Sequence, residues 1–279
     1  MRELKAERIT EAVRRLAIEA NLSLPSDVRR ALLDARADEP YAPACTLLDG
    51  MLENCRVAER EAIPICQDTG SACVFLRVGQ ELHIVGDLRE AVNEGVRRAY
   101  LDGGLRKSMV KDPLRRENTG DNTPAILYTE LVSGDRLEIT VAPKGFGSEN
   151  MSAISMLRPS DGVEGVKQFV LETVKKAGPN PCPPIVLGVG IGGTFDKAAY
   201  MAKHALLREL GTLHEDPFYR ALEEELLAEI NSLGIGPQGF GGRTTALGVH
   251  IEAMPTHIAG LPVAVNMNCH VTRHKSEVL

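Results

Sequence analysis

Three cysteines lie in breaks between predicted helices and strands, each in polar or proline-rich surroundings. Cys66 stands in P-I-C-Q-D-T-G, Cys182 in N-P-C-P-P and Cys269 in N-M-N-C-H. Prolines beside two of them remove backbone donors and fix the direction of the chain, so irregular loops are expected there. Because binding and catalytic residues concentrate on loops, these three thiols are candidates for chemistry.

The remaining cysteines have a simpler interpretation. Cys45 and Cys55 fall within a helical pattern, and Cys73 falls within the apolar run A-C-V-F-L-R-V. Cysteine in such positions usually acts as a small buried hydrophobic residue. A structural role is therefore expected for all three.

Thiolate sulfur is a soft ligand that suits iron-sulfur clusters, zinc or copper. The three loop cysteines are 116 and 87 residues apart, so they cannot form a local zinc knuckle, which needs C-x-x-C spacing. They can still converge in the folded chain, and a cluster with only three cysteine ligands leaves one iron open to substrate. The spacing alone leaves buried or incidental thiols, zinc and redox chemistry open as alternatives.

Polar motifs accompany these cysteines. Gln67 and Asp68 directly follow Cys66, so an amide and a carboxyl group would stand beside any metal bound there. E-N-T-G-D-N-T-P (117–124) and K-G-F-G-S-E-N (144–150) are rich in turn residues, and the backbone amides of the second can hold a carboxylate. Taken alone, each motif is equally typical of turn chemistry.

G-V-G-I-G-G-T follows an apolar strand pattern and precedes a helix, so a dinucleotide-binding turn must be considered. Its glycines at 188, 190, 192 and 193 do not match G-x-G-x-x-G, and the lysine of a phosphate-binding loop is absent from the motif. The alternation predicts instead a strand against which a helix packs closely.

The elements predicted around these motifs mix helices and strands without strict alternation, so the expected fold class is mixed α/β (α+β). Helices are expected over 1–20, 27–37 and 44–59, which gives a helical N-terminal portion of about 1–60. A mixed-sheet core flanked by helices is expected over about 61–279, and the whole chain of 1–279 is expected to be a single domain. P-A-I-L-Y-T-E-L-V and D-R-L-E-I-T-V-A, joined by S-G, predict a β-hairpin.

Composition and charge limit the kinds of partner that the chain is expected to bind. The 279 residues carry a formal net charge of −6 and no run of lysine or arginine, so neither nucleic acid nor an acidic membrane is favoured. No apolar window reaches the length of a membrane span, and the charged start M-R-E-L-K-A-E-R is unlike a signal peptide. A cytoplasmic location, in which thiols stay reduced, is expected.

Six motifs in order resemble one family. I-C-Q-D-T-G, E-N-T-G-D-N-T-P-A, P-K-G-F-G-S-E-N-M-S, N-P-C-P-P with G-V-G-I-G-G-T, G-I-G-P-Q-G-F-G-G and N-C-H resemble the iron-sulfur-dependent class I fumarate hydratases, a family that includes the tartrate dehydratases. The resemblance runs from about residue 40 to about residue 275. It implies that Cys66, Cys182 and Cys269 hold a 4Fe-4S cluster, whose fourth iron binds the hydroxyl and carboxylate of the substrate.

The same resemblance implies further site residues. Gln67, Asp68, Arg106 and the glycine turn around Gly147 would contact substrate, and Arg106 would clamp a carboxylate. Adding water across a carbon-carbon double bond needs a Lewis acid, charge-accepting groups and proton exchange. Asp68 would exchange a proton with the iron-bound hydroxyl, and His257 in M-P-T-H-I-A-G is expected at the same site; no second base is evident.

Longer members of this family carry a second domain, whereas this sequence ends ten residues after Cys269. The resemblance therefore implies the α subunit of a two-chain enzyme, with a separate β subunit and a heterotetramer formed by duplication of the pair. The expected reaction is reversible hydration of fumarate to (S)-malate, because K-G-F-G-S-E-N and I-G-G-T resemble the fumarase branch. The alternatives are an L(+)-tartrate dehydratase α subunit and a non-catalytic metal- or cluster-binding protein.

Overall fold

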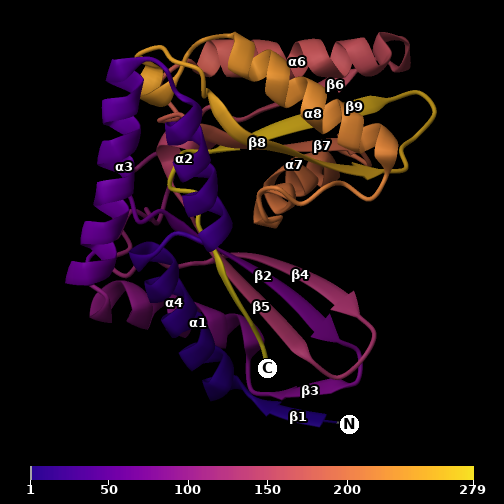
Figure 1. Ribbon diagram of the computed structural model, residues 1–279. Coiled ribbons are helices and arrows are strands. Elements are labelled where there is room, and N and C mark those ends of the chain that lie inside the picture. Colours follow the sequence, from indigo (N-terminus) through magenta and orange to yellow (C-terminus); the bar gives the residue numbers. More distant parts are fainter. Residues whose placement is uncertain (1) are drawn as a thin grey trace. The chain divides into compact units, whose positions relative to one another are not determined.

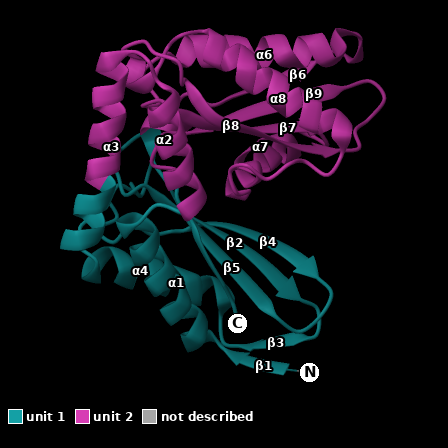
Figure 2. Ribbon diagram, in the orientation of Figure 1, with its two compact units in different colours: residues 1–25, 55–146, 273–279 teal, residues 26–54, 147–272 magenta. Residues whose placement is uncertain are grey.

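The computed structural model describes residues 2–279, which form two compact units. Unit 1 contains residues 2–25, 55–146 and 273–279, and unit 2 contains residues 26–54 and 147–272 (Figure 2). The single domain expected over 1–279 stays a prediction, because compact units of this kind can be parts of one domain.

Three helices fill the N-terminal portion, as the sequence predicted. They are α1 (Ala6–Leu22), α2 (Ser26–Asp38) and α3 (Ala42–Glu61), preceded by a short strand β1 (Arg2–Lys5) that the sequence analysis missed (Figure 1). With the mixed parallel and antiparallel sheets described below, this confirms the mixed α/β class. No helix within residues 2–279 combines the length and the apolar character that crossing a membrane requires.

Unit 1 is a four-stranded sheet packed against two helices. The sheet has the order β10-β5-β2-β4, and β1 pairs separately with β3. Leu16 of α1, Val96 of α4 and Leu76 of β2 are buried in one apolar core. The other elements of unit 1 are β2 (Ser71–Gly79), β3 (Leu82–Val85), α4 (Leu88–Asp102), β4 (Ile126–Val132), β5 (Leu137–Lys144) and β10 (Lys275–Val278).

The predicted hairpin is wrong. β4 and β5 are consecutive in the chain, but both pair with β2, which lies between them parallel to β4 and antiparallel to β5. Eight of the nine residues of β2 are buried, as is typical of a central strand. Burial of this apolar strand between two neighbours outweighs the local S-G turn signal, which would have paired β4 with β5 directly.

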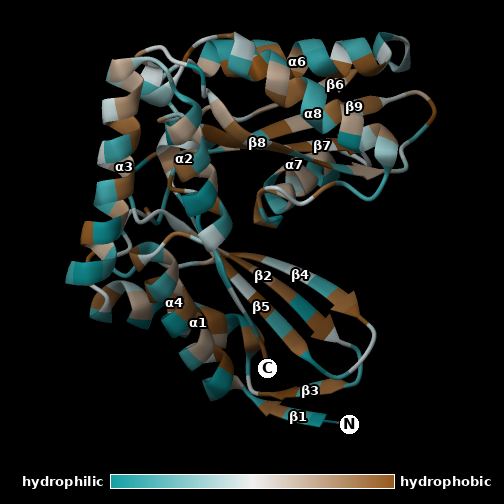
Figure 3. Cartoon of the chain, in the orientation of Figure 1, coloured by the Kyte–Doolittle hydropathy of each residue, from teal (hydrophilic) through white to brown (hydrophobic). Residues whose placement is uncertain are grey.

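Unit 2 holds a second four-stranded sheet, of order β6-β9-β7-β8. Figure 1 shows α6 and α8 on one side of this sheet and α7 on the other, and in Figure 3 the hydropathy colours of α6 alternate along its length. Its elements are α5 (Phe146–Glu149, starting at the end of unit 1), β6 (Ala153–Leu157), η1 (Pro159–Asp161), α6 (Gly162–Ala177), β7 (Ile185–Gly192), α7 (Phe195–His204), η2 (Ala205–Leu207), α8 (Pro217–Ser232), η3 (Pro237–Gly239), β8 (Ala246–Met254) and β9 (Leu261–Asn268).

The alternating glycines of β7 permit close helix packing, as predicted. Leu187 and Val189 face the core formed with α6 and α8, so the alternation of a strand turns Gly188 and Gly190 toward α7. A Cβ added at Gly188 would lie 1.9 Å from the carbonyl oxygen of Ala202. The motif therefore serves packing between a strand and a helix.

Replacing Gly188 by Ala is expected to lower the free energy of unfolding by about 3 kcal/mol or more, because overpacking costs about 1–3 kcal/mol and a backbone carbonyl cannot move aside easily. Urea denaturation measures the change. Gly50→Ala in α3 is the matched control: apart from the adjoining residues and the backbone of the same helix, no atom lies within 4 Å of an added Cβ there, and Ala is favoured over Gly inside a helix by about 1 kcal/mol. Equal unfolding free energies for G188A and wild type would contradict this packing.

His250 is a buried histidine within β8, only 3% exposed. Its Nδ1 donates to the carbonyl oxygen of Ala205 at 3.2 Å. Burial, reinforced by the positive charge of Arg208, lowers the pKa of His250 to about 4. The imidazole therefore stays neutral in the folded chain at neutral pH.

This histidine is expected to make stability depend on pH. The unfolded side chain has a pKa of about 6.5, so between about pH 4 and 6.5 the unfolded state binds more protons than the folded state. The stabilisation is complete above pH 6.5, and up to about 3 kcal/mol is lost as the pH falls to 4. Urea denaturation at pH 7.5 and 5 measures the loss, and a His250→Gln variant that loses just as much over this interval would contradict the assignment.

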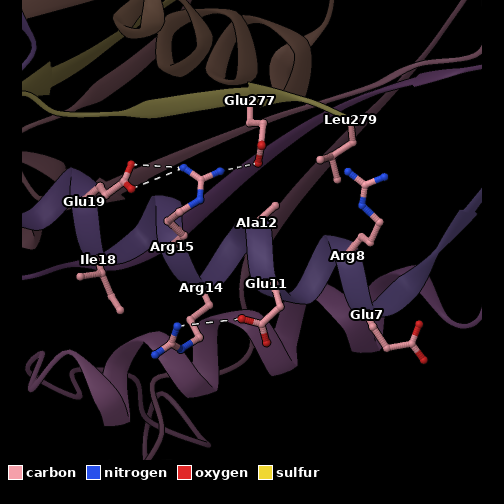
Figure 4. A pocket seen from close by; sticks show the side chains of 10 residues that line it. All are labelled: Glu7, Arg8, Glu11, Ala12, Arg14, Arg15, Ile18, Glu19, Glu277 and Leu279. Atoms are coloured by element: carbon pink, nitrogen blue, oxygen red, sulfur yellow. Dashed lines mark hydrogen bonds and ion pairs between the residues drawn. The ribbon is translucent and has the colours of Figure 1, made fainter.

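A groove of about 610 Å³ runs along α1 beside the C-terminal residues (Figure 4). Arg15 lies between Glu19 and Glu277 and forms ion pairs with both. These side chains are one-third to one-half exposed, and exposed pairs contribute only about 0–1 kcal/mol. A solvated charged surface is the simplest interpretation of this groove.

Candidate active site

Four loop segments meet at one end of the unit 1 sheet. I-C-Q-D-T-G leads directly into β2, and Ser71 pairs with Lys144, so K-G-F leaves β5 at the same end. β4 runs parallel to β2, which brings E-N-T-G-D-N-T-P to this end as well. β10 starts opposite Val141, near the end of β5. The residues just before β10 therefore lie at the same end of the sheet.

Asp68 is fixed within the first of these segments. Its Oδ1 accepts a hydrogen bond from the backbone amide of Gly70 at 3.0 Å, and its Oδ2 accepts one from the amide of Phe146 at 2.9 Å. A Cβ on Gly145 would lie 3.2 Å from Oδ2, so the glycine leaves room for the carboxyl group. The Asp68 amide lies 3.4 Å from the sulfur of Cys66. The half-buried carboxyl group thus has a defined orientation beside the thiol.

Two buried neutral side chains donate hydrogen bonds to the backbone carbonyl oxygens of the two residues that follow Asp68. The hydroxyl of Tyr100 donates to Thr69 O at 2.9 Å and to Gly70 O at 2.8 Å. Asn122, from E-N-T-G-D-N-T-P, donates to Gly70 O at 3.1 Å and accepts from the amides of residues 108–109. Both side chains are fully buried, so the turn is supported from the interior of unit 1.

A buried cation supports the same turn. Nη2 of Arg273 donates to the carbonyl oxygen of Asp68 at 2.7 Å, and the residue is 4% exposed. Burial raises the pKa of Tyr100, and the charge of Arg273 partly opposes this effect. The guanidinium is therefore close enough to influence groups around the turn electrostatically.

Two predicted substrate contacts of unit 1, Gln67 and Arg106, adjoin this turn. Gln67 does so in sequence, and Arg106 does so through a hydrogen bond. Gln67 precedes Asp68, and its side chain is exposed. The hydroxyl of Thr69 donates to the carbonyl oxygen of Arg106 at 3.1 Å, and the Arg106 side chain is exposed. Both residues are thus exposed, and the backbone of Arg106 is tied to the turn through Thr69.

Cys182 and Cys269 come together at one end of the unit 2 sheet. Val186 of β7 pairs with Asn268 of β9 in antiparallel fashion, so the segment before β7 and the segment after β9 adjoin. His270 donates to the carbonyl oxygen of Cys182 through its amide at 3.4 Å and through Nδ1 at 3.0 Å. The Cys182 side chain is exposed and that of Cys269 is half-buried.

G-I-G-P-Q-G-F-G-G reaches the same end of this sheet. Gln238 donates to the carbonyl oxygen of Pro183 through its amide at 2.8 Å and through Nε2 at 3.1 Å. Gln238 and Cys182 both have a positive φ, of 53° and 56°, in the left-handed region that non-glycine residues seldom adopt. The loop around Cys182 is thus held in an uncommon backbone conformation.

The predicted glycine turn also belongs to this end of unit 2. Gly147 is exposed in α5, and a Cβ there would meet only the carbonyl oxygen of Asn180 at 3.8 Å. Asn266 donates to Glu149 Oε2 at 2.9 Å and to Ser152 Oγ at 3.0 Å. S-E-N-M-S is therefore joined to N-M-N-C-H, which carries Cys269.

His257 lies elsewhere. It is exposed in the loop between β8 and β9, and its Nδ1 accepts from the amide of Ala259 at 3.1 Å. The eight residues of β9 separate this loop from Cys269, which at about 3.3 Å per residue amounts to roughly 25 Å. The structure brings Cys182 and Cys269 together, but it does not bring His257 to them.

Tyr100 and Arg273 are candidate site residues that the sequence analysis missed. Tyr100 lies within a helix whose apolar pattern accounts for it, and its hydroxyl partners appear only in the fold. Arg273 gave a weak signal, because it follows Cys269 by four residues in the same C-terminal run.

Comparisons with known proteins agree on one family. A family model described as "Fumarate hydratase (Fumerase)" matches residues 10–278. A chain of Methanocaldococcus jannaschii named "Putative L(+)-tartrate dehydratase subunit alpha" is 46% identical over 273 residues, which cover 95% of each chain. "L(+)-tartrate dehydratase subunit alpha" of Escherichia coli O157:H7 is 33% identical over 269 residues, covering 95% of this chain and 89% of that one.

Proposed function

Since the chain belongs to the fumarate hydratase (Fumerase) family, a family of hydro-lyases, we propose that it is the α subunit of a two-chain 4Fe-4S hydro-lyase that hydrates fumarate to (S)-malate reversibly. The observation that carries the proposal is the turn of Cys66, Gln67 and Asp68, in which a carboxyl group is oriented by two backbone amides beside a thiol. A closed structural metal site has no need of a proton-exchanging group at its edge. The turn therefore favours catalysis over a non-catalytic metal-binding role.

Cys66, Cys182 and Cys269 would hold the cluster. Across residues 2–279 no group of three His, Cys, Asp or Glu side chains already forms a ligand set, and Cys66 belongs to unit 1 while the other two belong to unit 2. The donor chemistry fits: all three are thiols outside disulfides in loops, none of them is buried, and thiolates are the usual ligands of such clusters. When bound, the cluster would supply a Lewis-acidic iron with an open position.

The residues of this chain would divide the remaining work. Asp68 would exchange a proton at its carboxyl oxygens with the hydroxyl group that is added or removed, since general acid-base catalysis requires a positioned group of this type. Arg106 would bind a substrate carboxylate through its guanidinium, and Gln67 and the amides around Gly147 would donate hydrogen bonds to it. A catalytic role for His257 stays a prediction that requires a site within reach of the β8–β9 loop.

The partner would be a separate β subunit that supplies the rest of the substrate site. The named relatives are themselves subunits alpha of a dehydratase, which supports a two-chain enzyme, and duplication of the αβ pair would give a heterotetramer. A cytoplasmic location is proposed because exposed thiol ligands persist in a reducing compartment.

Fumarate is the first substrate to test, and L(+)-tartrate is the second. K-G-F-G-S-E-N and I-G-G-T resemble the fumarase branch, whereas the names of the relatives favour tartrate. The chain should be purified and reconstituted anaerobically with its β partner, and malate formation from fumarate compared with oxaloacetate formation from L(+)-tartrate. A higher kcat/KM for fumarate, with about four irons and four sulfides per α chain, is the expected result. A higher kcat/KM for L(+)-tartrate would make tartrate, and not fumarate, the proposed substrate. Absence of both activities from an iron-loaded complex would refute the hydro-lyase proposal.

A further inference from the structure

We propose that Arg273 is a positioning residue of the candidate active site: its buried guanidinium holds the Cys66–Gln67–Asp68 turn and provides positive charge for an anionic group bound there. The part concerning the anion rests on the proposed function. The part concerning the turn rests on the geometry of unit 1 alone.

The holding role follows from the contact itself. Nη2 of Arg273 reaches the Asp68 carbonyl oxygen at 2.7 Å although the two residues are 205 positions apart. The neighbouring carbonyl groups of the turn are held by Tyr100 and Asn122, so Arg273 completes a row of three buried donors. It is the only charged member of that row, and no other donor to Asp68 O is found within residues 2–279.

The role of the charge follows from burial. Within the described part of the chain, Arg273 forms no ion pair with a carboxylate, and its buried Nε has no hydrogen-bond partner. A buried cation without a counter-charge is costly. An anion at the turn would offset that cost, and a thiolate-ligated cluster or a dicarboxylate substrate provides one.

Four variants test both parts. Arg273→Gln removes the charge, and Arg273→Lys keeps it but loses the planar fork. Tyr100→Phe removes neutral hydrogen bonds from the same turn without changing charge. Arg220→Gln is the matched control, because Arg220 of α8 also donates to a backbone carbonyl, that of His214.

Two measurements are made on each full-length variant. The first is amide hydrogen exchange of a peptide covering 66–71 in the cluster-free chain, which needs no activity. The second is the half-life of bound iron under a chelator in the anaerobically reconstituted αβ complex, together with kcat and KM.

Arg273→Gln and Tyr100→Phe are expected to speed exchange at 66–71, and Arg220→Gln is expected to leave it unchanged. Arg273→Gln should also shorten the iron half-life and lower kcat by about 10- to 100-fold, the usual effect of losing an outer partner of a metal site. Arg273→Lys should recover most of this loss, and Tyr100→Phe should retain iron better than Arg273→Gln.

Wild-type exchange in Arg273→Gln would overturn the holding role, and equal iron loss from the Gln and Lys variants would overturn the role of the charge. If the wild-type complex itself bound no iron and hydrated no dicarboxylate, the proposed function would fail and the part concerning the anion would fall with it. The exchange measurement on the cluster-free chain would still decide the holding role.

Discussion

Replacing Asp68 by Asn is expected to lower kcat of the αβ complex by roughly 10³-fold, within the range of about 10²–10⁴ that general acid-base catalysis contributes. The amide keeps the size of the carboxyl group but cannot exchange a proton in the same way. Iron content should stay near the wild-type value, because the carboxyl oxygens are engaged by the amides of Gly70 and Phe146 and are not expected to ligate metal. Steady-state kinetics and iron analysis of the same preparation check both statements.

Asp112→Asn is the control for backbone effects. Asp112 also accepts hydrogen bonds from two backbone amides, those of Leu114 and Arg115, in an irregular segment of unit 1. Its replacement should leave kcat within about twofold of wild type, because both amides donate to Oδ1, which Asn retains as an acceptor, so that only the local charge changes. An Asp68→Asn complex with full iron and a wild-type rate would show that Asp68 is not the proton-exchanging group.

Replacing Cys66, Cys182 or Cys269 by Ser is expected to abolish hydro-lyase activity. A serine hydroxyl is a poor replacement for a thiolate at a cluster that needs soft ligands. Iron and acid-labile sulfide should fall from about four of each per α chain to a small fraction of that value. The measurement is made after anaerobic reconstitution, so that oxidative loss of metal does not imitate the effect.

Cys45→Ser distinguishes ligand loss from general sensitivity to thiol replacement. Cys45 is a half-buried thiol in α3 whose sulfur lies 3.1 Å from the carbonyl oxygen of Glu39, a contact that a serine hydroxyl can reproduce. Its variant should bind iron normally. Iron retention by all three loop-cysteine variants would exclude the proposed ligand set.

Local patterns were sufficient to predict most of the elements. The apolar spacing of α1 and the alternating glycines of β7 are properties of neighbouring residues, and the corresponding predictions are confirmed. The S-G hairpin failed because strand pairing is decided between distant segments: β2 competes for both partners and gains burial on both sides.

The residues of the candidate site also fall into those that local sequence could predict and those that it could not. Gln67 and Asp68 could be singled out because they adjoin Cys66 in sequence. The support from Tyr100 and Arg273 could not be predicted, because a hydrogen bond between positions 31 or 205 residues apart has no sequence pattern. The position of His257 could not be predicted for the same reason. Only 12 residues separate it from Cys269 in sequence, but eight of them form the strand β9, which puts the two residues at opposite ends of that strand.

The interleaving of the two units bears on how the chain folds as it is synthesised. Domains generally fold as units in the order in which the ribosome releases them, yet unit 1 contains both ends of the described chain. Its strand β10 and the Arg273 contact to Asp68 come from the last seven residues, whereas unit 2 is complete at residue 272. Unit 1 therefore cannot be completed before all of unit 2 has been synthesised, and the turn carrying Cys66 and Asp68 gains its contact with Arg273 only after residue 272.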